Sequence, residues 1–575
     1  MNLFSEYQTK IFKILKQLEK KKIIILSNKL KSIKVELPPK NQKADLSCNV
    51  AMILAKENNT SPVKLAEILK IHLLKNFKEF NKIEIASPGF LNIFFDISFW
   101  KIYLSEIISL GAIYGSNFIF KNKFNIEFVS ANPTGPLHVG HCRGAILGDT
   151  LCNLLAFNGH KIDKEYYVND YGVQIKNFVS SVYFRIVEIN NNKPFPNDIN
   201  LYPGDYVIDI AKKIIKNKSI NNFTSFDKIY NKLSTLSLKY SMELIKSNLN
   251  LLGIKHDNFV YESNLIKNNE VKKIINKLKK NNYIYNGVLE APKGEKNNDW
   301  KERKQLLFKS TLFGDDVDRP LQKADGTWTY FAGDMAYHAN KISRNYSVLI
   351  NVLGSDHSGY IKRITSATEA ISKNKTKLIC KVSQLVKLFK NGQPFKMSKR
   401  KGDYITVEDL VAEVGKDSTR FMMLNRSNDV ELDFDFQKVT EKSKDNPVFY
   451  VQYAYARINS VFKILNLNLE KKIKIDNNNF SLNEYELGIL KKIAEWPKCV
   501  EVSSAKLEPH RIPFYLYELA SLFHSYWTLG KDNEEFRLIS KNDNLNYSRL
   551  GILQALSIVI KNGMTILGVS TPKKM

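Results

Sequence analysis

Apolar side chains recur at helical spacing at the start of the chain. The helix predicted over residues 3–18 would bury one face, made of Phe4, Tyr7, Ile11, Ile14, Leu15 and Leu18. Residues 50–80 show the same period, interrupted near Ser61-Pro62. The period then changes to two around Pro88-Gly89, as in a pair of strands, at Ile83, Ile85, Leu91, Ile93 and Phe95. Helices followed by a hairpin predict an α+β N-terminal domain over residues 1–115.

A second pattern, typical of a parallel sheet, begins near residue 124. A short apolar strand is predicted over Phe124 to Val129, and a helix over Val139 to Phe157. Between them, Asn132-Pro133 and Gly135-Pro136 indicate loop. A strand, a tight loop and a helix in this order form the βα step that opens a doubly wound α/β domain.

The remaining patterns extend this domain and add another. Residues 180–300 are mostly helical, with Asn-rich joints at Asn190 to Asn192 and Asn217 to Asn222, and are predicted to be an insertion. Strand patterns return around Trp328 to Phe331 and Ser347 to Val352. From about residue 445 to the end the helical period persists. We therefore predict an α/β protein: a Rossmann-like domain over 116–444, with an α+β domain before it and an all-α domain over 445–575 after it.

The net charge of the chain indicates what kind of partner the protein could bind. The 575 residues include 86 Lys and Arg against 58 Asp and Glu, which gives a net charge of +28. A basic protein of this kind favours polyanions, because each basic group near a phosphate releases a condensed counterion. The alternative is compositional drift, since the chain is rich in Lys, Asn and Ile as an A+T-biased genome would make it. Charge alone leaves both interpretations open.

The cysteines and the N-terminus bear on the compartment. The five cysteines stand far apart and form no Cys-x-x-Cys pair, at Cys48, Cys142, Cys152, Cys380 and Cys499. Neither a zinc ribbon nor a disulfide framework is indicated, and the sparse count fits a reducing compartment. The apolar run Ile23 to Leu26 is too short for a secretory signal, and no uninterrupted apolar run reaches the length of a membrane span. We expect a cytoplasmic protein without a membrane partner, with an organellar location left open.

The strongest local motif is His138-Val139-Gly140-His141 at the start of the predicted helix. A helix N-terminus offers unpaired N–H groups and the positive end of the helix dipole, so it attracts phosphate. Gly140 lacks the Cβ that would block close approach of a ligand. The two imidazoles, three residues apart, share one face and can donate hydrogen bonds as charge builds on a phosphate. The alternative is a pair of capping or surface histidines.

A second motif is Lys396-Met397-Ser398-Lys399, followed by Arg400, Lys401 and Gly402. The turn residues before it indicate a basic loop. Lys ammonium groups on such a loop can reach β- and γ-phosphates and stabilise departing pyrophosphate. The alternative is an ordinary solvated loop.

Together the two motifs resemble the paired motifs of class I aminoacyl-tRNA synthetases, with Val139 in place of the usual Ile. Other nucleotide and nucleophile motifs are missing from the chain: Gly-x-x-x-x-Gly-Lys-Ser/Thr, Gly-x-Gly-x-x-Gly and Gly-x-Ser-x-Gly. Longer stretches are similar to the arginyl branch of this class: 127–141, 165–172, 329–338 and the start of the helical tail at 446–457. Residues 43–56 and 82–95 are similar to that branch's N-terminal domain. The resemblance covers nearly the whole chain and is weakest over 180–300.

The resemblance implies an ATP site. His138, His141, Lys396 and Lys399 would be catalytic, stabilising the pentacoordinate phosphorus and the leaving pyrophosphate. Gly354, Asp356 and His357, after a predicted strand, would lie at the adenosine, with Asp356 on ribose hydroxyls. The full set of residues implied to bind ATP is Ala131, Asn132, Pro133, Thr134, Gly135, Pro136, Leu137, His138, Val139, Gly140, His141, Gly354, Asp356, His357, Met397 and Ser398.

The resemblance also implies an arginine site. An arginine side chain needs carboxylate acceptors for a planar set of five donors. Asp334 would accept from the guanidinium beside Tyr330, while Glu127 and Asn132 would hold the α-ammonium and α-carboxylate end. Ser130 and Tyr360 complete the implied set; relatives often have Gln near Tyr360, so that contact stays open. The alternatives are a solvent-facing Asp334, a core Tyr330 and an outward-pointing Glu127, which alternates with Ile126 and Phe128.

The reaction implied has two steps: arginine and ATP form arginyl-adenylate and pyrophosphate, and arginine then passes to the 2′-OH of the terminal adenosine of tRNA(Arg). ATP would enter with Mg²⁺ as a substrate complex, without a tightly bound metal, and the protein is expected to be a monomer. The N-terminal domain would be an additional tRNA-binding domain and the tail an anticodon-binding domain. Tyr450, Tyr453 and Tyr455 of the tail could stack RNA bases, although such aromatics are more often core. Two rival classes remain: a synthetase for another amino acid, and a non-catalytic RNA-binding protein with this fold.

Overall fold

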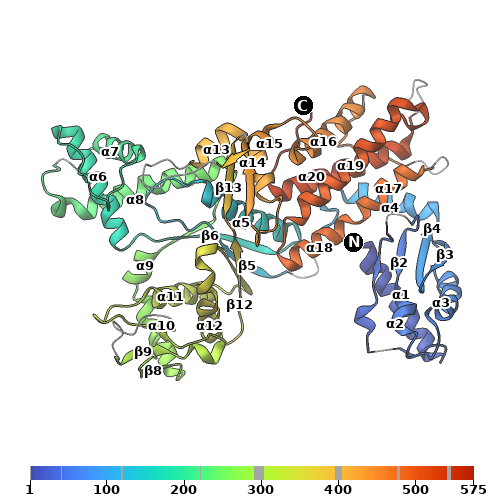
Figure 1. Ribbon diagram of the computed structural model, residues 1–575, viewed down its shortest axis with the longest axis horizontal. Helices are drawn as coiled ribbons and strands as arrows, with labels where there is room; N and C mark the ends of the chain where they lie inside the picture. Colours follow the sequence, from blue (N-terminus) through green and yellow to red (C-terminus); the bar gives the residue numbers. More distant parts are fainter. Residues whose placement is uncertain are drawn as a thin grey trace. The chain divides into compact units, whose positions relative to one another are not determined.

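The computed structural model describes residues 2–26, 28–39, 42–117, 121–220, 222–289, 303–390, 392–394, 405–475, 480–539 and 545–575. The chain divides into two compact units. Unit 1 combines the two ends of the chain, Met1–Asn117 with Lys442–Ile566 and Ser570–Met575. Unit 2 is Phe118–Glu441 with Leu567–Val569. Figure 1 colours the chain from blue to red, so unit 1 takes both ends of the colour scale.

Unit 2 is built on a parallel sheet of five strands, which confirms the predicted α/β class. The strand order is β12-β11-β5-β6-β7, and all four pairings are parallel. The strands are β5 (Lys123–Glu127), β6 (Lys161–Val168), β7 (Asn258–Tyr261), β11 (Val348–Gly354) and β12 (Lys377–Ser383). The first of these in the sequence, β5, lies in the middle. The chain therefore adds strands first on one side of β5 and later on the other, as in a doubly wound fold.

Helices pack on both faces of this sheet. After β5 the chain forms α5 (Val139–Phe157) and returns as β6; after β11 it forms α12 (Ile361–Ser372) and returns as β12. Because parallel crossovers are right-handed and the two run in opposite directions from β5, α5 and α12 cover opposite faces (Figure 1). On the α12 face, one apolar cluster joins β11 and α12 to α11 (Tyr330–Ser343) and α10 (Glu270–Lys280).

Two sequence-based predictions for unit 2 need correction. A strand was expected over Trp328 to Phe331, but Thr329 caps the N-terminus of α11 by accepting from the N–H of Ala332, and the chain is helical from Tyr330. The local cap outweighs the aromatic residues that suggested a strand. Residues 180–300 are not wholly an insertion either, because β7 is an edge strand of the parallel sheet.

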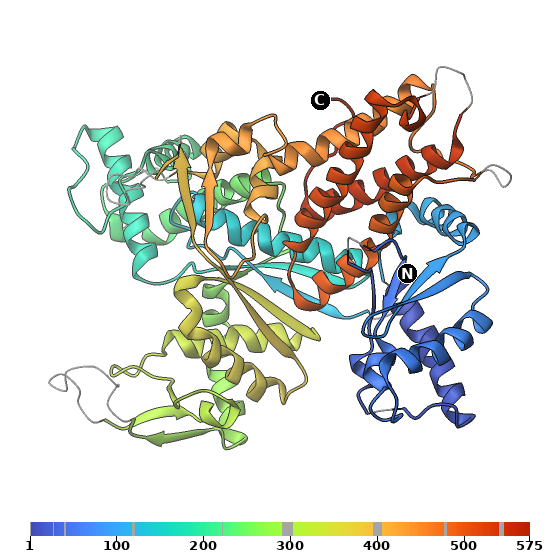
Figure 2. The same ribbon diagram turned by 45° about the vertical axis from the view of Figure 1, so that its right-hand side comes forward.

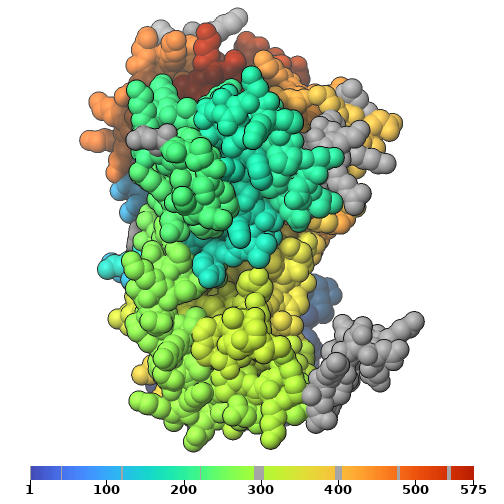
Figure 3. Space-filling view, turned by 90° about the vertical axis from the view of Figure 1, so that its left-hand side faces the viewer, coloured from blue at the N-terminus to red at the C-terminus, as the bar shows by residue number. Residues whose placement is uncertain are grey.

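Helices do dominate the stretch before β7. They are α6 (Val173–Asn191), α7 (Asp205–Asn217) and α8 (Phe226–Leu251), shown from teal to green in Figure 3. The Asn-rich joints end α6 and α7, as predicted. An apolar cluster of their own holds the three helices together, which is why they form a distinct lobe of unit 2.

Two smaller sheets complete unit 2. An antiparallel sheet in the order β10-β9-β8 contains β8 (Ile284–Gly287), β9 (Gln305–Phe308) and β10 (Arg319–Pro320). The other, in the order β14-β13-β15, contains β13 (Val386–Lys390), β14 (Gln393–Pro394) and β15 (Leu432–Asp435) (Figure 2). The short helices of unit 2 include α9 (Glu262–Lys267), which follows β7, and α13 (Val407–Val414), α14 (Lys416–Met423) and α15 (Phe436–Thr440).

The N-terminal part of unit 1 is α+β, as predicted. Its sheet has the order β1-β2-β4-β3, with antiparallel pairs, and the hairpin turns at Pro88-Gly89. The strands are β1 (Val35–Glu36), β2 (Leu46–Cys48), β3 (Phe80–Ala86) and β4 (Phe90–Phe95). The helices are α1 (Leu3–Lys20), α2 (Val50–Leu54), α3 (Pro62–Asn76) and α4 (Ile97–Leu110). All six apolar residues predicted to share a face of α1 are buried.

The C-terminal part of unit 1 is all helical, as predicted. Its helices are α16 (Pro447–Ile464), α17 (Glu484–Ala494), α18 (Trp496–Lys506), α19 (Arg511–Asp532) and α20 (Tyr547–Leu567). The Trp496 indole donates to the carbonyl of Tyr114, 3.0 Å away, and a Cβ on Gly115 would meet that indole at 2.3 Å. Gly115, with φ +93°, therefore allows the two parts of unit 1 to meet closely.

Among the described residues, α20 alone is long and apolar enough to cross a membrane. The argument from uninterrupted apolar runs did not predict this. However, 83% of its apolar window is buried inside the structure. Burial of this kind is typical of a core helix.

Candidate active site

The loop that follows β5 begins with a strained turn. Val129 has φ +71° and Ser130 has φ +41°, and a β-branched residue such as Val129 rarely adopts this conformation. Ser130 is held there by its own hydroxyl, which donates to Glu127 Oε1 at 3.0 Å and accepts from the N–H of Tyr167 at 3.0 Å. Strain of this kind persists where surrounding contacts enforce it, and it clusters at functional sites. Glu127 and Ser130, both predicted site residues, are thus brought together.

The next residues, Ala131 to Leu137, are fixed by side chains from other elements. Tyr166 donates to the carbonyl of Ala131 at 2.7 Å, and Tyr206 of α7 donates to that of Thr134 at 2.8 Å. The N–H of Leu137 donates to Asn248 of α8 at 3.0 Å. The helical lobe therefore shapes this predicted ATP-binding loop, which also includes the buried Pro133 and the half-buried Gly135 and Pro136. Asn132 is exposed, and its amide donates to Gln174 at 2.6 Å.

The two histidines cap the helix that they begin. His138 is the N-cap of α5, and its Nδ1 accepts from the N–H of Gly140 at 3.1 Å. His141 Nδ1 accepts from the N–H of His138 at 3.2 Å. The N–H groups of Val139 and His141 donate to the carbonyls of Ile405 and His138. The prediction that these first N–H groups are open to a phosphate is therefore wrong, and the capping alternative is correct for Nδ1.

Capping occupies Nδ1 of each histidine ring. A backbone N–H can only donate, so Nδ1 of both rings must be the acceptor and Nε2 carries the proton. The ring centroids are 4.0 Å apart at the tip of α5. A Cβ on Gly140 would meet the His138 ring at 2.9 Å. Gly140 therefore makes room for this cap, whereas the sequence suggested room for a ligand.

The second motif leads back to the same helix tip. Lys396, Met397, Ser398 and Lys399 lie outside the described residues. The chain on their C-terminal side is described: the carbonyl of Ile405 accepts from Val139, and the N–H of Val407 donates to the carbonyl of Leu137 at 3.0 Å. The segment that follows the second motif is therefore hydrogen-bonded to the residues on either side of His138.

The third predicted group lies at the carboxyl end of β11, beside that of β5. Gly354 ends β11, and Asp356 and His357 follow in a 3₁₀ helix (Ser355–Tyr360) as exposed side chains, 3.5 Å apart. Because α5 and α12 lie on opposite faces, the direction in which the sheet is wound reverses between β5 and β11. In doubly wound sheets, ligands bind at this switch point.

Asp334 of α11 is the centre of an acidic cluster. Burial raises the pKa of its carboxyl to about 7; a hydrogen bond from the Tyr360 hydroxyl opposes this, while the charges of Glu127 and Glu262 add to it. The predicted contact between Tyr360 and the site is thus present, but the tyrosine donates to Asp334. Lys341 lowers the pKa of Asp334, but the net shift is still upward, and a poorly solvated carboxylate of this kind favours a cationic ligand.

Sequence reasoning missed Glu262 and its neighbours. Glu262 begins α9 after β7, and burial and the charge of Asp170 raise the pKa of its carboxyl. Tyr167 at the end of β6 has its pKa raised by burial and by the charges of Glu262, Asp334 and Glu127. The residues of this cluster are far apart in the sequence. No pattern within a single segment of the chain could therefore have predicted it.

A buried polar chain, also missed, links the Glu127 carboxylate to the backbone carbonyl of Asp334. Lys341 of α11, fully buried, bonds Glu127 Oε2 at 2.5 Å and Asn351 Oδ1 at 3.0 Å. Asn351 in turn donates to His338 Nε2 at 3.0 Å, and His338 Nδ1 lies 2.9 Å from the carbonyl of Asp334. Burial lowers the pKa of His338 to about 3, so the ring is neutral and its Nδ1–H is the donor to that carbonyl. The spacing of Asp334, His338 and Lys341 on one helix face was the available signal.

Tyr330 lies apart from this cluster. Its side chain is 79% exposed, which excludes the core alternative, and the ammonium of Lys323 lies 5.2 Å from its ring centre. It stands at the first position of α11, one turn before Asp334.

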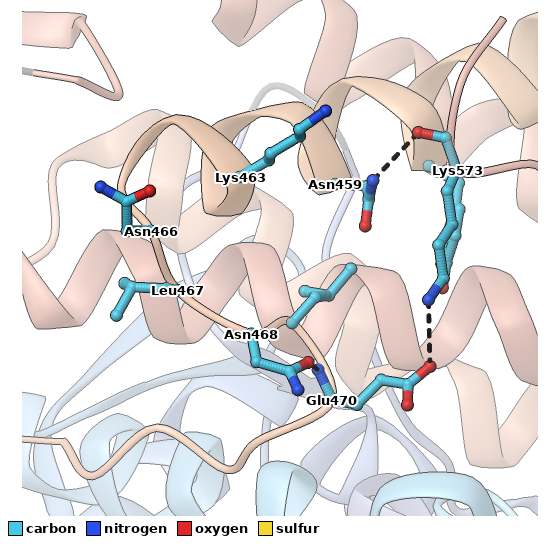
Figure 4. A pocket seen from close by; sticks show the side chains of 9 residues that line it. Asn459, Lys463, Asn466, Leu467, Asn468, Glu470 and Lys573 are labelled. Carbon is cyan, nitrogen blue, oxygen red and sulfur yellow. Dashed lines mark hydrogen bonds and ion pairs between the residues drawn. The ribbon is translucent and has the colours of Figure 1, made fainter.

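The helical tail has a polar aromatic cluster of its own. Tyr455 is buried, as expected for a core residue, whereas Tyr450 and Tyr453 are half-buried. The Arg457 guanidinium lies 4.1 Å from the ring centre of Tyr453 and 5.0 Å from that of Trp527. Helix α16 also lines a pocket of about 390 Å³ (Figure 4). Its lining is Tyr455, Asn459, Lys463, Asn466, Leu467, Asn468, Leu469, Glu470 and Lys573.

Three family models match the chain. An arginyl tRNA synthetase N-terminal domain matches residues 5–95, the catalytic domain of class I (R) tRNA synthetases matches 104–463, and a DALR anticodon binding domain matches 451–575. The chain is 57% identical to an arginine–tRNA ligase of Pelagibacter ubique and 42% identical to one of Agrobacterium fabrum, in each case over 100% of both chains.

Solved structures give the same result. A putative arginyl-tRNA synthetase of Campylobacter jejuni matches with a TM-score of 0.71 at 29% identity, over 84% of this chain and 100% of that one. The arginyl-tRNA synthetase of Thermus thermophilus matches with a TM-score of 0.67 at 17% identity, over 100% of both chains, which shows the likeness of fold.

Proposed function

The chain belongs to the arginyl-tRNA synthetase family, and from that premise we propose which of its residues carry out the reaction. It is an ATP-dependent class I ligase that activates L-arginine and joins it to the terminal adenosine of tRNA(Arg). Its catalytic residues are proposed to be His138, His141, Lys396 and Lys399. The observation that supports arginine as the substrate of this site is the acidic cluster around Asp334.

In this proposal the guanidinium of arginine enters between Asp334 and Glu262. The raised pKa of both carboxyls means that their ionised forms are poorly solvated in the free site. A bound cation would stabilise these ionised forms. Arginine fits better than lysine because its planar group reaches separate acceptors at once, whereas a single ammonium cannot. Glu127, held by Lys341 and Ser130, faces the α-ammonium, and Asn132 lies at the α-carboxylate end.

ATP is proposed to bind across the ends of β5 and β11. The Nε2–H groups of His138 and His141 donate to the α-phosphate as charge builds there during attack by the arginine carboxylate. Lys399 is proposed to act on the pyrophosphate; it is six residues before Ile405 in the sequence, and the carbonyl of Ile405 accepts from the N–H of Val139 at the start of α5. The adenosine lies at Gly354, Asp356 and His357. Mg²⁺ arrives with ATP and screens its phosphates; no resident metal is proposed.

The test of this assignment is ATP–pyrophosphate exchange. We expect exchange with L-arginine and none above background with lysine, citrulline or ornithine, each measured with and without total tRNA. Citrulline is the sharpest comparison because it keeps the shape of arginine and lacks its charge. Exchange with citrulline at the arginine rate would remove the acidic cluster from the substrate site.

Tyr360→Phe is expected to shift the pH dependence of arginine use. The Tyr360 hydroxyl stabilises ionised Asp334, so its loss raises the pKa of Asp334 further above 7, by about one unit. Arginine needs the ionised form, so kcat/KM for arginine falls as pH drops through that pKa, and the midpoint moves to higher pH in the variant. The profile of kcat/KM between pH 6 and 9.5 measures this.

Tyr285→Phe is the matched control, because the Tyr285 hydroxyl bonds Asp318 in the β8 region. Its profile should overlay that of the unchanged protein. A Tyr360→Phe profile with the same midpoint would mean that Asp334 does not titrate in arginine binding.

Lys399→Ala is expected to slow adenylate formation by about 100-fold or more while ATP affinity changes less than about threefold, because the lysine stabilises the leaving pyrophosphate more than bound ATP. Single-turnover rates and equilibrium ATP binding separate the two effects. An unchanged single-turnover rate would refute the role.

We propose that residues 1–115 and 445–575 bind tRNA and that 116–444 form the catalytic domain, which the three family matches support. The Tyr453–Arg457–Trp527 cluster suits stacking on unpaired bases. The protein is proposed to act as a cytoplasmic monomer without a membrane partner; its mass in solution, measured by light scattering, tests the oligomeric state.

A further inference from the structure

The segment that joins β6 to α6 exposes two large apolar side chains. Tyr171 is 60% exposed and Val173 is 74% exposed. They follow Val168, the last residue of β6, so they lie at the carboxyl end of the parallel sheet, where ligands bind in folds of this kind. Single exposed apolar side chains are common, but a pair two residues apart at such a place is a candidate binding surface. The mechanism proposed above uses neither side chain.

Hydrogen bonds place this segment beside the proposed arginine site. Gln174 accepts from the amide of Asn132 at 2.6 Å, and Asn132 is proposed to lie at the α-carboxylate end of arginine. On the other side of Tyr171, Asn169 turns its amide nitrogen toward Glu262 Oε2, 2.7 Å away, and toward the carbonyl of Tyr171, 3.1 Å away. Glu262 is proposed to face the guanidinium. The segment is therefore bonded, before and after Tyr171, to residues that are proposed to hold arginine.

The ring of Tyr171 is accessible to a ligand. Tyr167, four residues earlier in the same stretch, packs against the ring of Tyr337, with ring centroids 4.4 Å apart. No aromatic ring in the part of the chain that the structure describes packs on Tyr171 in this way. The bond from Asn169 uses the backbone carbonyl of Tyr171 and leaves most of its side chain exposed. Exposed aromatic rings beside a functional site are typical of surfaces that stack on unpaired bases.

The second step of the reaction brings such a base to this place. A ribose hydroxyl of the terminal adenosine of tRNA attacks the carbonyl carbon of arginyl-adenylate. The ester bond forms, the bond from that carbon to the phosphate oxygen breaks, AMP leaves and the hydroxyl proton is lost to solvent. The attacked carbonyl is the former carboxylate of arginine, which is proposed to lie at Asn132. The adenine is attached to the same ribose, so it lies close to the segment that is bonded to Asn132.

We propose that Tyr171 stacks on the adenine of the terminal adenosine of tRNA, and that Val173 extends this apolar contact. The order of the strands argues against the adenine of ATP as the occupant. In the order β12-β11-β5-β6-β7, β6 and β11 lie on opposite sides of β5, and the adenosine of ATP is proposed to bind at the end of β11. This inference rests on the proposed function, because it uses the place assigned to the arginine carboxylate.

The test is a double-mutant cycle between Tyr171→Ala and the base of the terminal nucleotide. Two forms of tRNA(Arg) are compared, one with its terminal adenosine and one with an abasic ribose there, which keeps both hydroxyls and lacks the adenine. Tyr171→Ala is expected to lower kcat/KM for the complete tRNA by about 10- to 100-fold, the effect of losing the stacking of one base. For the abasic tRNA the same substitution should cost less than about twofold. Tyr171→Phe keeps the ring and should stay within about twofold of the unchanged protein.

The outcomes separate this inference from the proposed function. If Tyr171→Ala costs the same factor with both tRNAs, the ring does not contact the adenine and the inference is overturned. If the unchanged protein charges neither tRNA with arginine, the proposed function fails instead. Equilibrium binding of the two tRNAs gives a second measurement of the same cycle, with the same two readings. Because Tyr171 is exposed, the melting temperature should not change; should Tyr171→Ala not fold, the cycle is measured with Tyr171→Leu and read in the same way.

Tyr285→Ala is the matched control. Tyr285 of β8 is also an exposed tyrosine of unit 2, at 37%. Whatever its loss does to tRNA binding, it should change kcat/KM by the same factor for the complete and the abasic tRNA. A factor that depended on the adenine in this variant as well would mean that the cycle does not report a contact with Tyr171, and would overturn the inference.

Discussion

Asp334→Asn should raise the KM for arginine by about 100- to 1000-fold. The substitution keeps the size of the side chain and removes the charge that is proposed to face the guanidinium. Losing one partner of a desolvated charge pair costs about 3–4 kcal/mol, and each 1.4 kcal/mol is a factor of ten. Affinity for ATP should stay within about threefold, because the proposed nucleotide site uses other strand ends.

The same substitution should stabilise the free protein at alkaline pH. The pKa of Asp334 rises from 3.8 to about 7 on folding. Because the unfolded chain ionises at a lower pH than the folded protein, the folded state loses stability progressively between about pH 3.8 and pH 7, and the loss is complete above about pH 7. An asparagine cannot ionise, so the variant avoids that loss, up to about 4 kcal/mol for a shift of three units.

Thermal denaturation without ligands at pH 5.5 and pH 8.5 measures this. The melting temperature of the variant should exceed that of the unchanged protein at pH 8.5 by more than at pH 5.5. Asp325→Asn serves as the control, because Asp325 is exposed in a turn and its pKa is lowered by hydrogen bonds from Thr327. A normal arginine KM in Asp334→Asn would remove the residue from the pocket, and a pH-independent difference in melting temperature would contradict the stability argument.

His138→Ala should lower the rate of adenylate formation by about 100- to 1000-fold, and His138→Asn should lower it as much. Both lose the Nε2–H donor, and one lost donor to developing charge typically has an effect of this size. The two variants should differ in stability. Alanine also loses the cap on the N–H of Gly140, at a cost of about 1 kcal/mol, whereas asparagine is a good N-cap and keeps an acceptor there.

Single-turnover rates and thermal denaturation of the pair separate catalysis from capping. If His138→Asn recovers both rate and stability, the imidazole acts only as a cap. If both variants lose rate in proportion to lost stability, the donor role is likewise excluded. Far-UV circular dichroism should match that of the unchanged protein in either case.

The hydrophobic pattern of the sequence predicted an element correctly where the structure of that segment depends mainly on its own residues. The strand of Phe124 to Glu127, the loop after it and the helix from Val139 follow from apolar period and turn residues, and all three are present. The same approach failed at Trp328 to Phe331, where the Thr329 cap begins a helix. It also failed at Asn258–Tyr261, because four residues are too few to show a period and only pairing with β6 identifies the strand.

The residues of the candidate site also differ in how well the sequence predicted them. His138, His141, Glu127 and Asp334 were predicted to be site residues because each lies in a stretch that resembles the family, and the structure places them near the ends of β5, α5 and α11. Gly140 was chosen for the wrong reason, since it accommodates the His138 ring. Lys396 and Lys399 lie outside the described residues, so their approach to the histidines stays a prediction.

By itself, the sequence determined the α/β class, the helical tail and the histidine pair, because these depend on periodicity and on residues near one another in the chain. Tertiary structure alone decided that Glu262 stands near Asp334, that Lys341 neutralises Glu127, and that Asn132 bonds Gln174. The physical reason is that burial and charge interactions depend on distance in space. A shifted pKa or a buried hydrogen bond therefore depends on the folded structure, and the hydrophobic periodicity of the sequence does not predict it.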